Sequence, residues 1–302
     1  VIHEMGHQFG ANHTFNGNTG SCSGNRVGTV AYEPGSGTTI MAYAGICGTN
    51  NITSNSDDYF HRASIAEIAT FLGTISCDVE TNSGNTIPTV NSYVATYYVP
   101  YKTPFEITAS ASDPNGDPIK YCWEEWDLGP SGSWGTTGLV TAPIFRSFLP
   151  SYSPTRTFPR WDSLINNAIR YKGEVLPEVT RDVKFRCTVR DIRNGYGTFN
   201  APDANLLVKS VNTGSLFRVS NFASNTTITA NTAQTITWDL GGTDASPISC
   251  TGVDILLSLD SARTFPYVLA GNMPNDGSQE VIIPDVFTAN ASARIKVKGN
   301  GN

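Results

Sequence analysis

The chain has 302 residues, a formal net charge of −6 and no cluster of lysine and arginine, which argues against nucleic acid as a partner. Hydrophobic residues make up 39% of it, and no apolar run approaches the ~20 residues that a membrane-spanning helix needs. The length predicts two or three domains. Six cysteines without a CxxC pair are typical of disulfides in an oxidising compartment, so we expect a secreted or cell-surface protein.

The first thirteen residues, VIHEMGHQFGANH, contain three of the four histidines. His3 and His7 are four residues apart, so they would lie one turn apart on the same face of a helix. Gly10 lets the chain leave that helix sharply, because glycine adopts positive φ without a steric penalty. The turn brings back His13 as a third nitrogen ligand. This spacing predicts a metal site of three imidazoles, with Zn2+ as the expected ion.

Glu4 lies between the first two histidines and is the expected catalytic base. Three imidazoles leave zinc an open position for water, whose pKa the metal lowers to about 7. A neighbouring carboxylate can take the proton from that water and pass it to the leaving amine. The alternative is a set of surface histidines that match HExxH by accident, and the added Gly10 and His13 favour the metal site.

The pattern HExxHxxGxxH, from His3 to His13, resembles the zinc signature of the metzincin metallopeptidases. The resemblance implies a zinc-dependent endopeptidase that acts on peptides or proteins. Met41, in the segment TTIMAYAGIC, matches the methionine turn that lies under the three histidines in this family. Taken alone, Met41 would be an ordinary core methionine.

Tyr43 follows this methionine by two positions. In the astacin-like and serralysin-like branches, a tyrosine at this place faces the zinc, as a ligand that swings away or as a donor to the oxyanion. The alternative is a half-buried aromatic side chain of the turn, and the sequence leaves both open. The reprolysin branch generally lacks this tyrosine.

The segment FHRASIAEIATFLG predicts a helix that starts with a capping box of Ser64 and Glu67 and ends at Gly73. With the following Cys77, it resembles the last helix of reprolysin domains. The segments EPGSG, TIMAYAGIC and SDDYFH resemble secreted reprolysin-like proteases of Bacteroidetes-type bacteria, which implies a bacterial source.

Asp57, Asp58 and His61 precede that helix. They could help to bind calcium or shape a substrate pocket, but a solvated loop that caps itself is favoured.

In metzincins a large N-terminal subdomain precedes the zinc helix and forms the upper wall of the cleft. Only Val1 and Ile2 precede the motif here, so we expect a C-terminal fragment that binds zinc but cleaves peptides poorly.

After residue 80 the sequence changes to short β-patterned runs separated by turn residues. The predicted fold class is α+β and multidomain: the C-terminal part of a metzincin catalytic domain, mainly helical, followed by two all-β immunoglobulin-like or fibronectin-like sandwich domains. The predicted boundaries are 1–80 for the protease part, 81–87 for a linker, 88–211 for the first sandwich, with an irregular insertion at 143–176, and 212–302 for the second.

The turn ASDPNGDPI offers three oxygen-bearing side chains, those of Asp113, Asn115 and Asp117. Calcium binding is the less favoured interpretation of this turn, and a plain hairpin turn is favoured.

Two disulfides are expected, Cys22–Cys47 around the loop that leads into the methionine turn and Cys122–Cys187 from their mid-strand positions. Cys77 resembles a reprolysin cysteine whose partner lies in the upstream subdomain, and Cys250 has no obvious partner.

The sequence therefore predicts a secreted zinc endopeptidase. The rival is a non-catalytic surface or adhesion protein of β-sandwich domains that carries a degenerate metalloprotease remnant. The intact Glu4 argues against the rival, because degenerate homologues tend to lose that carboxylate first.

Overall fold

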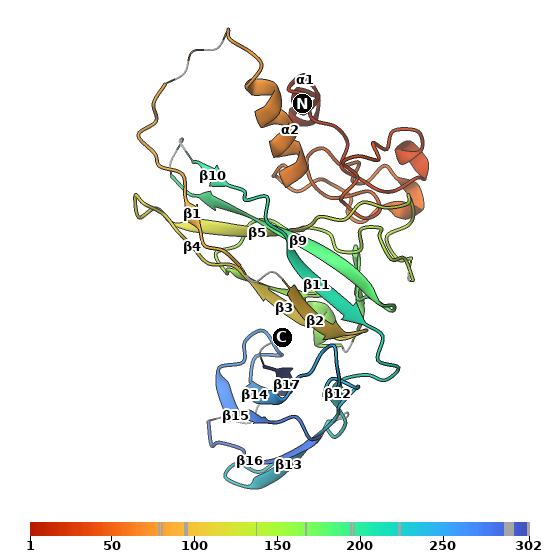
Figure 1. Ribbon diagram of the computed structural model, residues 1–302, viewed down its shortest axis with the longest axis vertical. Helices are drawn as coiled ribbons and strands as arrows, with labels where there is room; N and C mark the ends of the chain where they lie inside the picture. Colours follow the sequence, from red (N-terminus) through yellow and green to blue (C-terminus); the bar gives the residue numbers. More distant parts are fainter. Residues whose placement is uncertain are drawn as a thin grey trace.

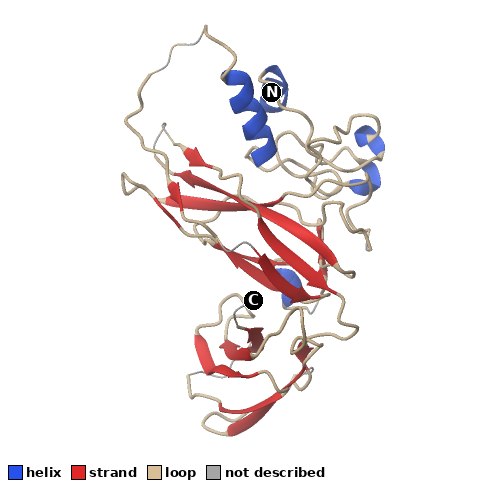
Figure 2. Cartoon of the chain, viewed as in Figure 1, coloured by secondary structure: helices blue, strands red, loops and turns tan. Residues whose placement is uncertain are grey.

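The structure is a computed structural model, and it describes residues 1–77, 79, 81–93, 96–136, 138–166, 168–193, 195, 197–222, 225–286 and 293–300. Three parts follow one another along the long axis of the molecule (Figure 1). The N-terminal part, residues 1–77, lies at one end. The first β-rich part, with strands β1 to β11, lies in the middle, and the second, with strands β12 to β17, lies at the other end. The described chain is mostly β, with few helices and several small sheets (Figure 2).

The N-terminal part contains two α-helices, α1 (Ile2–Gln8) and α2 (Arg62–Leu72), and two single turns of 3-10 helix, η1 (Gly20–Cys22) and η2 (Gly48–Asn50). Loop makes up most of the rest, so the expectation of a mainly helical piece is wrong. The reason is composition, because glycine, asparagine and serine between the helices favour turns over helix. Cys22 and Cys47 form the expected disulfide.

Helix α2 begins two residues before the predicted capping box. His61 is the N-cap, and its Nδ1 accepts a hydrogen bond from the Ala63 amide at 3.1 Å. The Arg62 amide donates to Glu124 Oε1 at 3.0 Å. Ser64 therefore lies inside the first turn, and the predicted Ser64–Glu67 capping box is wrong. A partner distant in sequence satisfies the helix start instead.

The main sheet of the first β-rich part has β9 (Arg181–Asp191) near its centre. Strand β5 (Ile119–Glu125) pairs with it antiparallel, and β11 (Leu206–Val211) pairs antiparallel with β9 and parallel with β2 (Thr96–Pro100). The remaining elements are β1 (Thr89–Val90) with β4 (Ala111–Ser112), β3 (Phe105–Thr108) with β6 (Thr155–Phe158), β7 (Arg170–Tyr171) with β8 (Glu174–Val175), β10 (Phe199–Asn200) beside β9, and α3 (Trp161–Leu164).

Residues of β9 alternate between the two faces of this sheet. Val183, Phe185 and Val189 are buried in the core, where the Phe185 ring lies 4.7 Å from the ring of Phe158. The alternate side chains lie on the opposite face, where Arg190 donates a hydrogen bond to the Phe60 carbonyl of the N-terminal part at 3.3 Å. This alternation gives the sheet one apolar face and one polar face on which the N-terminal part rests.

The predicted Cys122–Cys187 disulfide is wrong, and both cysteines are free. In the β5–β9 register, Cys122 is opposite Thr188 while Cys187 is opposite Trp123. Opposed residues point to the same face of a sheet and consecutive residues to opposite faces, so the two thiols lie on different sides. Burial raises the pKa of the Cys187 thiol to about 12. Neither thiol is therefore poised for exchange.

In its described residues, the second β-rich part has two three-stranded sheets. One contains β12 (Arg218–Val219), β13 (Ala233–Asp239) and β16 (Ser278–Ile282), and the other contains β15 (Tyr267–Pro274), β14 (Gly252–Ser258) and β17 (Arg294–Gly299). Their shared core includes Ile236, Trp238 and Ile255.

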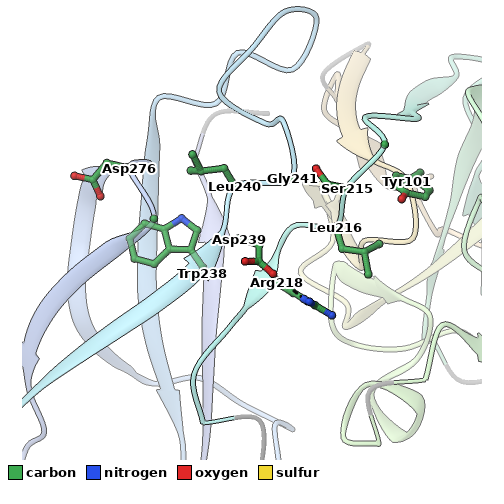
Figure 3. Close-up of a pocket in the computed structure, with 11 residues that line it drawn as sticks. Tyr101, Ser215, Leu216, Arg218, Trp238, Asp239, Leu240, Gly241 and Asp276 are labelled. Atoms are coloured by element: carbon green, nitrogen blue, oxygen red, sulfur yellow. Dashed lines mark hydrogen bonds and ion pairs between the residues drawn. The ribbon is translucent and has the colours of Figure 1, made fainter.

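An open cleft of about 670 Å3 lies where the two β-rich parts meet (Figure 3). Tyr101 and Leu216 lie on one side of it and Trp238 on the other, with the ion pair of Arg218 and Asp239, 2.8 Å long, between them. All of its lining residues come from the β-rich parts, so it is separate from the histidines.

Glu106 of β3 joins the two β-rich parts by ion pairs with Lys298 at 2.8 Å and Lys296 at 3.0 Å, both on β17. Burial raises the pKa of Glu106, but the hydrogen bonds and charges of the two lysines outweigh it, so that the pKa is lowered overall. A lowered pKa means that this contact stabilises the folded arrangement above the unfolded pKa of 4.5 and weakens as the pH falls below it.

We expect acidification below pH ~4 to separate the two β-rich parts before either unfolds. Small-angle scattering against pH would then show the molecule lengthen or become mobile while the β signal in circular dichroism persists. Glu106→Gln should produce the same change at neutral pH. Identical scattering from this variant and the wild type at pH 7 would contradict the prediction.

The cysteine arrangement predicts a specific labelling pattern. In the native protein, an alkylating reagent should label exposed Cys77 quickly and leave buried Cys122, Cys187 and Cys250 unlabelled. After unfolding without reductant, all four should be labelled, while Cys22 and Cys47 remain linked. A mass that shows Cys122 and Cys187 protected after unfolding would mean that they are bridged.

Candidate metal centre

Three histidine side chains converge at the end of α1. His7 Nε2 lies 3.1 Å from His3 Nε2 and 3.1 Å from His13 Nε2. One ligand atom from each residue lies within 4.8 Å of the others. Nitrogens that share a tetrahedral zinc at its usual bond length are about 3.3 Å apart, so the observed spacing is close to that of a common ion.

The other ring nitrogen of each histidine fixes its tautomer. His3 Nδ1 lies 2.7 Å from the Ile40 carbonyl oxygen, His7 Nδ1 lies 2.8 Å from that of Ala11, and His13 Nδ1 lies 2.7 Å from that of Asn25. A carbonyl oxygen can only accept, so each Nδ1 carries the proton and donates it. Each Nε2 is left with its lone pair.

Three lone pairs that face one another repel, and no hydrogen lies between them when each proton is on Nδ1. A bound cation removes this repulsion, and such outer hydrogen bonds are the usual way in which proteins orient histidine ligands. Burial lowers the pKa of His13; the Asn25 carbonyl opposes this effect, and repulsion from His7 and His3 adds to it. The donor set therefore fits a metal ion that prefers imidazole nitrogen.

The helix and the turn after it place the ligands as their spacing predicts. His3 and His7 lie on one face of α1, and Gly10 turns the chain with a φ of +84°. The Ala11 amide then donates to the Gly6 carbonyl at 2.9 Å, which closes the turn. An L-residue at position 10 would be strained at this φ.

Met41 lies directly under α1 and is fully buried. A Cβ added at Gly6 would lie 2.4 Å from Met41 Sδ and 3.2 Å from the Phe60 ring. Gly6 thus allows the methionine turn to approach the helix between the two histidines. The sequence offered no signal for this role beyond a glycine inside a short helix, where glycine is otherwise unfavourable.

Tyr43 lies beside the histidines, with its ring centroid 4.4 Å from His13 and 5.6 Å from His3. Its ring centroid is also 4.7 Å from that of Phe15, whose ring stacks on His13 at 5.2 Å. Burial raises the pKa of Tyr43, and the negative charge of nearby Glu4 raises it further. The phenol is therefore neutral at physiological pH and able to donate a hydrogen bond.

Glu33 is a buried carboxylate that sequence reasoning missed. Its oxygens accept four hydrogen bonds, from the hydroxyl groups of Thr14 and Thr39 at 2.6 and 2.7 Å and from the amides of Thr38 and Thr39 at 3.0 and 3.1 Å. Through Glu33, these bonds connect Thr14, the residue after His13, to residues 38 and 39, which lead into Met41. No residue pattern signals this, because the four donors are brought together only by the fold.

The segment before α2 is not the solvated loop that was favoured from the sequence. Asp57 pairs with Arg146 at 2.8 Å, and burial raises its pKa while Arg146 lowers it. His61 is 1% exposed, and its ring is nearly parallel to the rings of Tyr32 and Trp126, with its centroid 6.0 Å from each. Aromatic packing against the first β-rich part replaces solvent here.

The turn that was considered for calcium is held by its own backbone. Asp113 Oδ1 accepts hydrogen bonds from the amides of Asn115 at 2.8 Å and Asp117 at 3.0 Å. This is the geometry of an Asx turn, and calcium at this turn has no support.

Among the described residues, no helix is both long and apolar enough to cross a membrane.

Comparison with known proteins gives one match in the N-terminal part. The family model of reprolysin-like metallopeptidases, family M12B, matches residues 1–72, which points to a metzincin-like origin for this part of the chain. No curated protein matches the chain.

Two solved structures are similar at low identity. Fibronectin(III)-like modules of Clostridium thermocellum CbhA share 14% identity over 64% of this chain and 77% of theirs, with a TM-score of 0.23. A chimeric titin Z1Z2–Z1Z2 tandem shares 10% identity over 70% of this chain and 96% of its own, with a TM-score of 0.19. Neither likeness bears on the fold or the function at these TM-scores.

The contact between Gly6 and Met41 yields a prediction. In Gly6→Ala the new methyl group would overlap Met41 Sδ, and overpacking typically costs ~1–3 kcal/mol, against a gain of up to ~1 kcal/mol in helix propensity. We expect urea denaturation to show a net loss of stability. Met5→Ala, at a 47% exposed position of the same helix, is the matched control and should have little effect. A Gly6→Ala protein as stable as the wild type would show that Met41 moves aside freely.

Proposed function

We propose that the protein is a zinc-dependent endopeptidase that hydrolyses peptide bonds in peptide or protein substrates. The observation that supports this most is the convergence of three Nε2 atoms, on rings that are each oriented by a carbonyl oxygen at Nδ1. The match of residues 1–72 to reprolysin-like metallopeptidases supports the same class of reaction.

In this proposal His3, His7 and His13 hold the ion. When bound, zinc polarises a carbonyl group and makes a water molecule acidic enough to lose its proton near neutral pH. Glu4 is exposed on α1, and its charge acts on both His13 and Tyr43, so its carboxylate is near the same face of the cluster. It would accept a proton from the attacking water and deliver it to the leaving amine.

Tyr43 would assist by hydrogen bonding. Its raised pKa keeps the phenol protonated, so that the hydroxyl group can donate to the oxygen on which negative charge develops. Met41 would act only as packing beneath the ligands, since it is fully buried below α1.

We also propose an extracellular location, in secreted form or at the cell surface. The Cys22–Cys47 disulfide supports it, because such bonds persist in oxidising compartments. The disulfide joins η1 to the chain beside η2, and therefore braces the loops around Tyr43.

The central test is Glu4→Gln. We expect zinc content equal to that of the wild type, because Glu4 is not a ligand in this proposal. Chelator-sensitive cleavage of a quenched casein substrate should fall by about 100- to 10,000-fold, the usual contribution of a general base. Zinc content is measured on the same samples by elemental analysis.

Tyr43→Phe separates the two roles left open for this residue. A donor to the oxyanion predicts lower turnover with unchanged KM and zinc content, whereas a packing residue predicts full turnover, because phenylalanine keeps the ring. The proposed mechanism would be contradicted by cleavage that does not require a metal. It would also be contradicted by zinc-dependent cleavage that Glu4→Gln leaves intact. Zinc binding without any cleavage would favour the non-catalytic surface protein.

A further inference from the structure

The turn that carries His13 rests on one face of α2. The Phe9 ring packs edge-on against the Phe71 ring with centroids 6.2 Å apart, and a Cβ added at Gly10 would lie 3.3 Å from Phe71 Cβ. One helical turn earlier on α2, Glu67 reaches Asn12. Positions 67 and 71 share a face because residues four apart on a helix are neighbours. Residues 9–12 thus have a continuous support.

Glu67 binds Asn12 with both carboxylate oxygens. The Asn12 amide donates to Oε2 at 2.8 Å, and Asn12 Nδ2 donates to Oε1 at 2.7 Å. Hydrogen bonds to an ionised acceptor are stronger than neutral ones, and two parallel bonds also fix orientation. Because one of the two donors is the backbone amide, the contact restrains the main chain immediately before His13.

The third ligand depends on this restraint more than the other two. His3 and His7 have helical backbone, whose own hydrogen bonds hold them in register. His13 follows a glycine turn, and its ring is oriented by the carbonyl of Asn25, itself part of a loop. The bond from the Ala11 amide to Gly6 connects this turn to α1, and the clamp by Glu67 connects the backbone next to His13 to a second helix, α2.

Helix α2 is itself firmly attached. Its first amide donates to the fully buried Glu124 at 3.0 Å, and the Arg62 side chain pairs with Asp203 at 2.9 Å. Glu67 consequently projects from a helix that the first β-rich part holds in place.

We propose that Glu67 is a positioning residue for the metal centre, which sets the place of His13 through Asn12. The inference rests on the proposed metal site but goes beyond it, because it gives a role to a carboxylate outside the HExxHxxGxxH pattern. Its loss should weaken metal binding and change the coordination geometry without removing a ligand.

The test uses Glu67→Ala, Glu67→Gln and the control Thr70→Ala in the full 302-residue chain. Thr70 is exposed on the same helix, and its hydroxyl group donates within the helix to the Ala66 carbonyl. Zinc affinity is measured by competition with a chromophoric chelator. The visible absorption of the Co2+-loaded protein reports coordination geometry, which a general loss of stability would not alter.

We expect Glu67→Ala to bind zinc about 10- to 100-fold more weakly, the usual effect of removing a residue that orients a ligand, and to show an altered Co2+ spectrum. Glu67→Gln should retain most of the affinity. Its carbonyl can accept from the Asn12 amide, and its NH2 group can donate to the Asn12 side chain once that amide rotates. Thr70→Ala should match the wild type in both measurements.

Failure of this inference is distinct from failure of the proposed function. A wild-type chain that binds no zinc would overturn the metal site itself. Zinc binding with equal affinity and equal Co2+ spectra in wild type and folded Glu67→Ala would overturn the positioning role alone. If Glu67→Ala does not fold, Glu67→Asp decides: its carboxylate is one methylene shorter and cannot span both Asn12 donors, so a folded variant with unchanged zinc affinity and an unchanged Co2+ spectrum would refute the clamp.

Discussion

One carboxylate, that of Glu124 on β5, connects the metal centre to the rest of the molecule. It is fully buried, accepts a hydrogen bond from the Arg62 amide at the start of α2 and another from the Thr188 hydroxyl group, and lies 3.7 Å from His61 Nε2. The N-terminus of a helix is positive and has free amides, so it is a natural partner for a buried negative charge. This contact holds the start of α2 against β5, and the ion pair of Arg62 with Asp203 adds to it.

The N-terminal part needs such support because it has little hydrophobic core of its own. Its buried apolar cluster contains Phe15, Cys22 and Cys47, with Tyr43 packed against them. Polar bonds fill the gap: Glu33 gathers four donors inside the part, and Arg146 and Glu124 reach it from outside. The first β-rich part therefore supports the N-terminal part structurally.

The sequence predicted the candidate site more completely than it predicted the fold. The positions of His3, His7 and His13 could be inferred because helix periodicity and one glycine turn determine them locally. The Cys122–Cys187 pairing failed because strand register, which decides the face of each thiol, is set by distant chain segments. The cap at Ser64 failed for the same reason, since a side chain from β5 competes for the helix start. Local rules hold until a tertiary partner intervenes.

The separation in sequence between the foundation and the site has a consequence for biosynthesis. Asp203, the partner of the Arg62 side chain, is synthesised 141 residues after it. Glu124, the partner of the Arg62 amide, is synthesised 62 residues after it. At the usual ~5–20 residues per second, ribosomes would need roughly 7 to 28 seconds to supply the last of these partners. Until Trp126 has been made, the rings of Tyr32 and His61 also lack the aromatic partner that stacks beside them in the folded protein. The contacts that hold α2 are therefore complete only after residue 203 has been made.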